Sequence, residues 1–428
     1  MRKQSQVHLP SEEVMPIGLE AIGLYVPKHY IELDDLAKAR GVDPAKYRNG
    51  LGQRRMAVAT PCEDTVTLAV GAARSAIARY GIDPESIGQV VVGTETGIDH
   101  SKPVSVYVSE FLGLPTRSRS FEIKHACFGA MAGLAASIDW IRSGRARGRK
   151  ALVVASDIAR YEMKGAGEPT GGAGAVAMVV SDSPTLVDID AEADGCYSRQ
   201  VMDFWRPLYR KEPVVDGHYS IGCYLDALSG AYAAYRESTT IATPNFASSL
   251  VATLFHAPFA KMVKKAHQRL LEDDAQRRFE NDAAELERVQ EDFQRRVLPY
   301  LEANANIGNL YTGSLFVSLL NFIERAGSRH VGERISLFGY GSGCAAEFTT
   351  ARVLDGCKAI PSPTYEAVLA ERWRIDIPQY EAMTTAAASM DADGATVCDP
   401  ARWGVHGDAL YLGTKNHVRQ YATVRASS

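Results

Sequence analysis

Short runs of β-branched residues alternate with longer helical patterns along the first half of this chain. Runs at 86–97, 149–161 and 174–182 are apolar and end in polar or glycine residues, which is typical of buried strands that lead into loops. Between the first two runs, apolar residues from Met131 to Ile141 recur at helical spacing. Strands that alternate with helices predict a layered α/β fold rather than an all-helical or all-β chain.

The second half of the chain repeats this order of elements. Residues 249–259 form a strand-like run, 308–323 form a helical pattern rich in small residues, and 334–354 read as two strands around a glycine turn. The repetition indicates an internal duplication with its break near Ser183. We therefore predict three segments: a disordered N-terminal extension over 1–15, a first half over 16–183 and a second half over 184–428.

The stretch 264–301 is dense in alternating charges, with Leu, Phe and Val at helical spacing. This pattern predicts solvated surface helices, a charged helical insertion in the second half. Beyond about Asp355, "IPSPTYEAVLAERW" and "DIPQYEAMTTAAASM" are typical of short helices. Spacing alone assigns no chemistry to this C-terminal stretch.

The composition argues against two classes of binding partner, nucleic acid and membrane. A chain of 428 residues that is 46% hydrophobic can bury a large core, and its net charge of −4 gives no global attraction to nucleic acid or anionic membrane. No apolar run approaches the roughly 20 residues that span a bilayer, and the N-terminal stretch lacks the apolar segment of a secretory signal. We expect neither nucleic acid nor a membrane as partner.

The cysteines set a further expectation. The seven cysteines form no CxxC pair and leave one unmatched, so the count predicts neither a zinc site nor a disulfide framework. A reducing, cytoplasmic setting fits this pattern best.

Cys127 stands in "FEIKHACFGAMAGLAASIDWI", where a strand-like segment gives way to a helical one. At the head of a helix, exposed backbone N–H groups and the helix dipole favour an anion, so a thiolate would be stabilised and nucleophilic. Free cysteines are also among the most buried residue types and commonly act as small hydrophobic filler. The position alone leaves both interpretations open.

Two polar residues at strand ends are candidate partners for a nucleophile. Glu95 lies in "GTETG" and His256 in "LFHAPF". A carboxylate in a partly apolar pocket has its charged form disfavoured, which suits a general base that must also act as an acid. Taken singly, Glu95 also fits an ordinary surface loop, and His256 fits a structural histidine. Spacing cannot show that the three residues meet.

A series of motifs in order carries a resemblance along nearly the whole chain. They are "YVPKHYIELDDLAKARGVDPAKY", "GTETGIDHSKP", "HACFGAMAGL", "SDIARY", "GEPTGGAGAVAM", "DFWRPLYRKEPVVDGHYSIGCYLDAL", "FHAPFAKMVKKA", "GNLYTGSL", "GYGSGCAAEF" and "LYLGTKNHVRQYA". With these, the chain resembles the 3-hydroxy-3-methylglutaryl-CoA (HMG-CoA) synthase family of the thiolase superfamily. The resemblance implies a five-layered αβαβα fold built from two related halves, and a homodimer.

The resemblance also implies an activity and the residues that perform it. In this family the motif cysteine, here Cys127, is acetylated by acetyl-CoA, and the glutamate at Glu95 removes a proton from the acetyl methyl. The resulting carbanion attacks the ketone of acetoacetyl-CoA, which His256 binds and polarises, and water releases the product. The implied enzyme is cytoplasmic, serves the mevalonate pathway of isoprenoid biosynthesis, and needs no metal or other cofactor beyond its coenzyme A thioester substrates.

Further residues match motif positions that bind substrate in the family. They are Asp157, Tyr161, Thr170, Asp203, Lys261, Lys265, Asn309 and Ser342. Asn309 and Ser342 would orient acetoacetyl oxygens. Thr170 lies in "GEPTGGAGA", which is expected to be a flexible loop over the pocket, although its spacing also fits a tight turn. Lys261 and Lys265 stand one helical turn apart, so both can face the phosphates of coenzyme A, although a solvated basic face would show the same spacing.

Two positions depart from the family pattern. Phe128 stands where a tyrosine is common, and His125 stands where bacterial members often have an acidic residue. A charged His125 would lower the pKa of a neighbouring thiol, whereas a neutral, packed histidine would not.

The main alternative is the β-branching synthase of polyketide assembly lines, whose acyl groups ride on an acyl carrier protein. The "KMVKK" lysines favour free coenzyme A without excluding a carrier. Ketoacyl synthases of the superfamily lack the glutamate, and a non-catalytic acyl-CoA-binding protein would have lost the nucleophile or the base.

Overall fold

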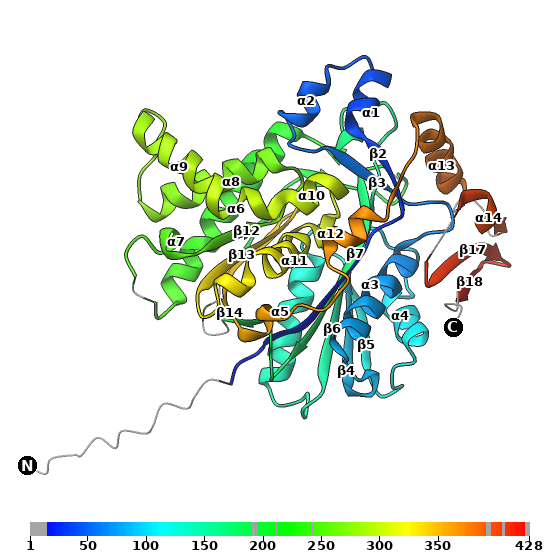
Figure 1. Ribbon diagram of the computed structural model, residues 1–428, viewed down its shortest axis with the longest axis horizontal. Helices are drawn as coiled ribbons and strands as arrows, with labels where there is room; N and C mark the ends of the chain where they lie inside the picture. Colours follow the sequence, from blue (N-terminus) through cyan, green and yellow to red (C-terminus); the bar gives the residue numbers. More distant parts are fainter. Residues whose placement is uncertain are drawn as a thin grey trace, which may run out of the picture.

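The computed structural model describes residues 15–190, 193, 195–210, 212–241, 243–390, 395–404 and 407–423 (Figure 1). The predicted disordered extension over 1–15 lies outside the described residues except for Met15, whose side chain is exposed.

One ten-stranded sheet runs through both halves of the chain. Its order is β12-β13-β14-β8-β1-β7-β6-β4-β5, and β9 pairs with β14. The strands are β1 (Gly18–Tyr25), β4 (Ile87–Gly93), β5 (Arg119–Ile123), β6 (Lys150–Ala159), β7 (Gly172–Ser181), β8 (Val187–Ile189), β9 (Cys196–Ser198), β12 (Ala252–Phe255), β13 (Arg334–Gly341) and β14 (Ala345–Val353). β8 pairs with β1 on one side and β14 on the other, so it joins the strands of the two halves.

Helices cover and separate the two parts of the sheet. Helices α3 (Thr65–Tyr80) and α4 (Val104–Leu112) pack on the outer side of the first half, and α6 (Gly217–Ser238) and α8 (Ala260–Asp274) pack on the outer side of the second. Helices α5 (Gly129–Arg142) and α11 (Ser314–Arg325) lie between the halves (Figure 1). Each of the three helical layers has its own apolar core against the strands. This arrangement confirms the five-layered, thiolase-like αβαβα fold.

The two halves share a local topology. In the first, β4 is parallel to β6, which is antiparallel to β7, and α5 precedes β6. In the second, β12 is parallel to β13, which is antiparallel to β14, and α11 precedes β13. β4 and β12 are therefore equivalent strands. Because Glu95 follows β4 and His256 follows β12, the two candidate residues leave equivalent strand ends.

The expected helix over 308–323 begins later than its pattern suggests. The helix α11 starts at Ser314, and the residues before it form an irregular turn and the short 3₁₀ helix η4 (Tyr311–Gly313). The turn follows Gly308, whose φ is 95° and favours glycine. Asn309 therefore lies in a turn rather than on a helix face.

Smaller elements surround this core. A three-stranded sheet combines β2 (His29–Glu32), β3 (Arg55–Val58) and β15 (Trp373–Arg374), and a ribbon outside the main sheet pairs β10 (Phe204–Trp205) with β11 (Val214–Val215). The C-terminal sheet contains β16 (Thr396–Val397), β17 (Ala409–Lys415) and β18 (Val418–Thr423). The remaining helices are α1 (Leu33–Ala39), α2 (Pro44–Arg48), α7 (Phe246–Ser249), α9 (Ala283–Arg296), α10 (Glu302–Ile307), α12 (Tyr365–Ala370), α13 (Ile377–Ser389) and α14 (Pro400–Trp403).

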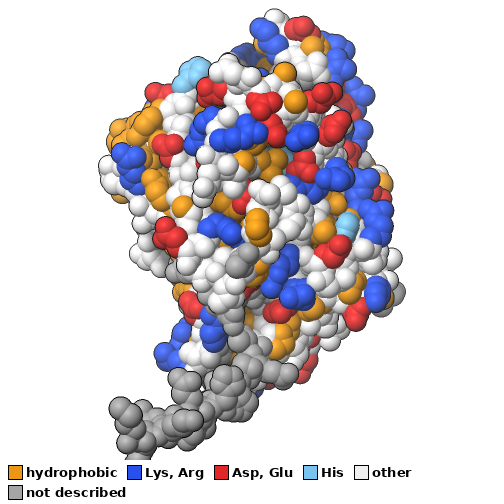
Figure 2. Space-filling model, turned by 90° about the vertical axis from the view of Figure 1, so that its left-hand side faces the viewer, with side chains coloured by type: hydrophobic (Ala, Val, Ile, Leu, Met, Phe, Trp, Pro, Cys, Tyr) orange, Lys and Arg blue, Asp and Glu red, His pale blue; other side chains and the backbone are white. Residues whose placement is uncertain are grey.

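The charged stretch forms the predicted surface helices. In α9, Val289 and Phe293 are buried while most charged residues are exposed. Basic and acidic side chains are interspersed over the face that Figure 2 shows. The two C-terminal helices were also predicted, and they are α12 and α13. No helix among the described residues is long and apolar enough to cross a membrane.

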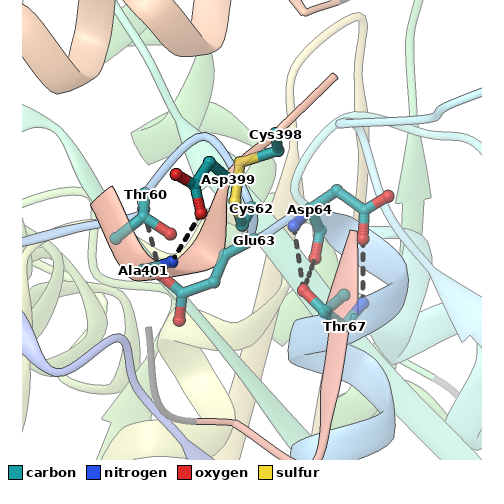
Figure 3. The surroundings of a disulfide bond; sticks show 8 residues. All are labelled: Thr60, Cys62, Glu63, Asp64, Thr67, Cys398, Asp399 and Ala401. Atoms are coloured by element: carbon teal, nitrogen blue, oxygen red, sulfur yellow. Dashed lines mark hydrogen bonds between the residues drawn. A yellow bond between two sulfur atoms is a disulfide. The ribbon is translucent and has the colours of Figure 1, made fainter. Parts of the chain in front are cut away.

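A disulfide between Cys62 and Cys398 contradicts the expectation that the cysteines form none (Figure 3). The two residues are 336 positions apart, so neither their count nor their spacing revealed the pair. Tertiary contacts bring them together: the Tyr411 amide donates to the Cys62 carbonyl at 2.9 Å, and Asp64 accepts hydrogen bonds from Arg419 and Tyr421 at 2.8 and 2.6 Å. The bond ties the C-terminal sheet to the start of α3.

Candidate active site

Cys127 and Glu95 are in direct contact. Cys127 lies two residues before Gly129, the first residue of α5, and it is only partly buried, so a ligand can approach it. Its Sγ donates a hydrogen bond to Glu95 Oε1 at 3.0 Å. The structure thus joins two residues that the sequence could only propose as partners.

Close packing between β4 and α5 explains this contact. A Cβ atom on Gly93, the last residue of β4, would lie 2.2 Å from the Ala130 amide nitrogen. Only glycine therefore lets the end of this strand approach the first turn of the helix. The loop carrying Glu95 is held against the segment that carries Cys127.

The pKa of Cys127 differs from the sequence-based expectation, whereas that of Glu95 is shifted in the expected direction. Burial raises the pKa of the Cys127 thiol well above its ordinary value, and the neighbouring Glu95 charge raises it further. The prediction of a thiolate stabilised by the helix terminus is wrong for this resting site, because desolvation and a carboxylate oppose the dipole. Burial, followed by the charge of Asp157, raises the pKa of Glu95 to about 8. A carboxyl poised near neutral pH can both accept and return a proton.

Asp157 organises the loop around Glu95. It is fully buried on β6. Its Oδ1 accepts from the Glu95 and Thr96 amides at 2.9 and 3.0 Å and from the Thr94 and Thr96 hydroxyls, while Oδ2 accepts from the amide and hydroxyl of Thr312. Donors from both halves thus converge on one carboxylate, a placement that favours support of the Glu95 loop over direct contact with substrate.

His256 enters the site from the second half. Its amide donates to the Phe338 carbonyl at 2.7 Å, which continues the pairing of β12 with β13, and its own carbonyl accepts from the Tyr224 hydroxyl at 2.7 Å. The Tyr224 ring lies 6.3 Å from the imidazole, and the Cys127 charge raises its pKa in addition to burial. Tyr224 therefore lies near both His256 and the nucleophile. Burial lowers the pKa of His256 to about 3, so its imidazole is neutral at physiological pH.

The glycine turn that carries Ser342 packs on the nucleophile segment. A Cβ atom on Gly341 would lie 2.5 Å from the Phe128 amide nitrogen, so backbone meets backbone there. Asp203 is fully buried and fixes the turn: its carboxylate accepts from the Tyr340 hydroxyl at 2.6 Å and from the Gly343 amide at 2.9 Å. Ser342 is partly exposed and lies beside the Cys127 segment.

Tyr161, Thr170 and Asn309 lie on two loops that contact each other. The Asn309 amide donates to the Gly171 carbonyl at 3.2 Å, and Asn309 Oδ1 accepts from the Tyr311 amide at 2.9 Å. The Thr170 hydroxyl donates to the Gly167 carbonyl at 2.7 Å. Tyr161 lies near the reacting pair, because the Cys127 and Glu95 charges add to the burial that raises its pKa to about 12.

A buried ion pair anchors the loop that carries Thr170. Glu168 is buried and accepts from Arg40 through both oxygens at 2.8 Å, and from the Tyr380 hydroxyl at 3.2 Å. The loop that was expected to be flexible is therefore attached to the segments around α1 and α13. Such a bidentate pair fixes geometry as well as charge.

Lys261 and Lys265 are both exposed near the start of α8, one turn apart. The Lys261 amide donates to the Leu51 carbonyl at 3.3 Å, so the start of α8 is attached to the loop after α2.

His125 packs edge-on against Phe128, with ring centroids 5.9 Å apart, and burial lowers its pKa. This direction favours the neutral, packed histidine over the charged one.

Sequence reasoning missed Arg206. Its Nη1 donates to the Glu95 carbonyl at 2.9 Å, and its Nη2 lies 3.6 Å from Glu95 Oε2. The only available signal was its place in the "DFWRP" motif, because nothing in the spacing connects position 206 with position 95. Thr312, which binds Asp157 from the second half, was missed for the same reason.

A cavity of about 840 Å³ lies elsewhere, among α7, α8 and α9, and contains none of these residues. Its arginines are paired with carboxylates, Arg277 and Arg288 with Glu285 and Arg295 with Asp292, so these arginines are not free to bind an anionic ligand. Within the described part of the chain, no group of three or more His, Cys, Asp or Glu residues is placed to hold a metal ion.

Comparisons with known proteins cover nearly the whole chain. The sequence profiles of the N-terminal and C-terminal parts of hydroxymethylglutaryl-coenzyme A synthase match residues 14–184 and residues 187–292 and 280–370. Hydroxymethylglutaryl-CoA synthase of Enterococcus faecalis is 36% identical over 95% of this chain and 100% of its own. The structure of MvaS in complex with 3-hydroxy-3-methylglutaryl coenzyme A matches with a TM-score of 0.84 and 42% identity, over 96% of this chain and 99% of that one. The HMG synthase of the curacin biosynthetic pathway, in complex with apo donor-ACP, matches with a TM-score of 0.86 and 34% identity, over 96% and 100%.

Proposed function

We propose roles for individual residues in this chain, which belongs to the hydroxymethylglutaryl-CoA synthase family and is an acyltransferase. The enzyme condenses acetyl-CoA with acetoacetyl-CoA and water, forming 3-hydroxy-3-methylglutaryl-CoA and releasing CoA. The contact between Cys127 Sγ and Glu95 Oε1 carries the proposal, because it joins a nucleophile to a base whose pKa lies near neutral.

Acetylation of Cys127 is the first step. The sulfur attacks the acetyl carbonyl, the bond from that carbon to the sulfur of coenzyme A breaks, and an acetyl-cysteine forms. The thiol proton ends on the departing thiolate, which leaves as the free thiol of coenzyme A. A covalent intermediate divides one difficult condensation into steps with lower barriers.

Condensation follows on the acetyl-cysteine. Glu95 takes a proton from the acetyl methyl, and the resulting carbon nucleophile attacks the ketone of acetoacetyl-CoA. The neutral imidazole of His256 donates a hydrogen bond to the ketone oxygen as it gains charge. Glu95 gives its proton to the resulting alkoxide. Water then attacks the thioester carbonyl, so that the C–S bond breaks and the product carboxyl group and the Cys127 thiol are released. Every step uses side chains of this protein and coenzyme A thioesters, so we propose that no metal or redox cofactor takes part.

Other residues bind the substrates in this scheme. Ser342 and Asn309 orient the acetoacetyl oxygens by hydrogen bonds, while Tyr161 and Thr170 line the acyl pocket. Lys261 and Lys265 bind the phosphates of coenzyme A, since both ammonium groups are exposed on the first turns of α8.

A carrier-bound substrate is the second candidate. The similar curacin synthase is seen with a donor acyl carrier protein, and the same exposed lysines would suit an acidic carrier surface. We favour free coenzyme A, because the similar MvaS was solved with a CoA thioester of the product and is more identical to this chain than the curacin enzyme is.

The assembly and setting are proposals as well. Strand β5 ends the sheet and pairs only with β4 within the described residues, so it offers an edge at which a second copy can pair in a homodimer. We propose a cytoplasmic enzyme of the mevalonate pathway. The Cys62–Cys398 bond is unusual for a cytoplasmic protein, because disulfides are rare in reducing compartments.

The deciding experiment is HMG-CoA formation from free acetyl-CoA and acetoacetyl-CoA, with mass spectrometry of the protein. We expect turnover at a kcat/KM of about 10⁴ M⁻¹s⁻¹ or more. Cys127→Ser should abolish acetylation, whereas Glu95→Ala should retain it and lose roughly 10²- to 10⁴-fold in condensation. His256→Ala should weaken the use of acetoacetyl-CoA with acetylation intact. Acetylation without turnover on free acetoacetyl-CoA would favour the carrier-bound substrate.

A further inference from the structure

Arg206 reaches the catalytic base from the opposite half of the molecule. It follows β10 in the two-stranded ribbon outside the main sheet. Its guanidinium touches Glu95 at two points, the main-chain carbonyl at 2.9 Å and the carboxylate at 3.6 Å, and it lies over the Tyr311 ring with the guanidinium carbon 5.9 Å from the centroid. A planar fork held at three places can fix both the loop and the side chain of Glu95.

The other groups around Glu95 are neutral or negative. The negative charge of Asp157 on β6 raises the pKa of Glu95, and the Cys127 thiol donates a hydrogen bond to Glu95. The phenols of Tyr161 and Tyr311 lie in its field, and burial raises the pKa of each. His256, on the opposite strand end, is neutral because burial lowers its pKa. Glu95 itself is 7% exposed, so water compensates little of its charge.

From this geometry, and on the premise that Glu95 is the base, we propose that Arg206 is a positioning residue for the condensation step. It aims the Glu95 carboxylate at the acetyl-cysteine and favours its ionised form. When Glu95 takes the methyl proton, the C–H bond breaks, an O–H bond forms on Glu95, and the electron pair moves into the enolate. The pocket keeps one negative charge throughout, and Arg206 balances it before and after the transfer.

The charge of Arg206 acts on both reacting groups in the direction this role requires. It opposes the burial that raises the pKa of Glu95, and it likewise opposes the rise at Cys127. Removing the charge should therefore leave Glu95 protonated to a higher pH. If Arg206 only stabilised the ribbon, its replacement would not change the pH at which Glu95 ionises.

The experiment follows the condensation half-reaction from pH 6 to 10, with enzyme first acetylated on Cys127 and then mixed with acetoacetyl-CoA. The acid limb of the condensation rate against pH is expected near pH 8 in the parent enzyme. Arg206→Met should move this limb upward by about one pH unit or more, and each unit should lower the rate at pH 7 by about tenfold. Arg206→Lys should keep the limb near its parent position with a lower plateau, because a lysine ammonium keeps the charge but does not reproduce the planar fork that spans the carbonyl and the carboxylate. Arg210→Met, an exposed arginine of the same segment, is the matched control and should change neither.

The outcomes separate this inference from the proposed function. The role of Arg206 is overturned if Arg206→Met lowers the maximal condensation rate but leaves the acid limb of the pH profile at its parent position. It is also overturned if the pH profile of Arg206→Met equals that of the parent enzyme. If Arg206→Met does not fold, the limb of Arg206→Gln decides in the same way. If Glu95→Gln retains condensation, Glu95 is not the base and the proposed function fails; loss of condensation in Glu95→Gln with an unmoved limb in Arg206→Met refutes Arg206 alone.

Discussion

Replacing Asp157 by alanine is the sharpest test of how the site is supported. The carboxylate is fully buried and accepts from three backbone amides, those of Glu95, Thr96 and Thr312, at 2.9, 3.0 and 3.1 Å. It also accepts from the hydroxyls of Thr94, Thr96 and Thr312, which can rotate to other acceptors. The backbone amides cannot turn away. Asp157→Ala therefore leaves the Glu95 and Thr312 amides without an acceptor, whereas the Thr96 amide keeps the Thr94 hydroxyl at 2.9 Å.

The magnitude follows from that count. Each unsatisfied buried donor costs about 1–3 kcal/mol, so two would cost roughly 2–6 kcal/mol. Water entering the space left by the carboxylate recovers part of this, and single substitutions rarely exceed about 5 kcal/mol, so we expect about 2–5 kcal/mol. With an unfolding entropy of about 2.1 cal/mol/K per residue over 428 residues, the melting temperature should fall by roughly 2–6 °C.

Catalysis should suffer more than stability. Without Asp157, the loop that aims Glu95 at the acetyl-cysteine loses its anchor. A displacement of about 1 Å costs about a hundredfold in rate, so condensation should fall by at least that factor. Acetylation of Cys127 should decline less, because the segment before α5 has its own packing against Gly341.

The assay combines thermal unfolding with separate rates for acetylation and condensation. Asp157→Asn should be milder, about 1–3 kcal/mol, because one oxygen remains and only the Thr312 amide loses its acceptor. Asp139→Ala, an exposed aspartate on α5, is the control. A melting temperature of Asp157→Ala within 1 °C of the parent, together with unchanged condensation, would refute the reasoning.

Three further predictions follow from the buried groups. Because the folded-state pKa of Glu95 is raised to about 8, folding favours the protonated form, and stability is lost as pH rises from 4.5 to 8. Glu95→Gln should therefore raise the melting temperature at pH 8 and not at pH 4. An equal gain at both pH values would contradict this. Cys398→Ser should lower the free energy of unfolding by up to about 5 kcal/mol, because the disulfide links residues 336 positions apart. It should also abolish any sensitivity of the melting temperature to dithiothreitol. A parent protein that melts identically with and without reductant would disprove this prediction. Glu168→Gln removes the charge that binds Arg40, so the KM for acetoacetyl-CoA should rise about tenfold with a smaller change in kcat, and an unchanged KM would show that the loop needs no anchor.

The sequence by itself determined the layered α/β architecture and its duplication. Strand and helix patterns depend on local periodicity, which is present in the chain before it folds. The helical pattern after Met131 placed Cys127 at the start of α5, and the repeated order of elements anticipated the equivalent ends of β4 and β12. Motif identity then supplied the family and the roles expected of Glu95, Cys127 and His256.

Tertiary structure alone decided the contacts and the charge states. The sulfur of Cys127 meets a carboxylate in a buried site, so its pKa rises where the helix terminus alone predicted a fall. Arg206 is brought to Glu95 across 111 positions, and Cys62 to Cys398 across 336, by packing between the two halves and the C-terminal sheet. Desolvation and long-range pairing depend on what surrounds a group in space, and no local pattern encodes that.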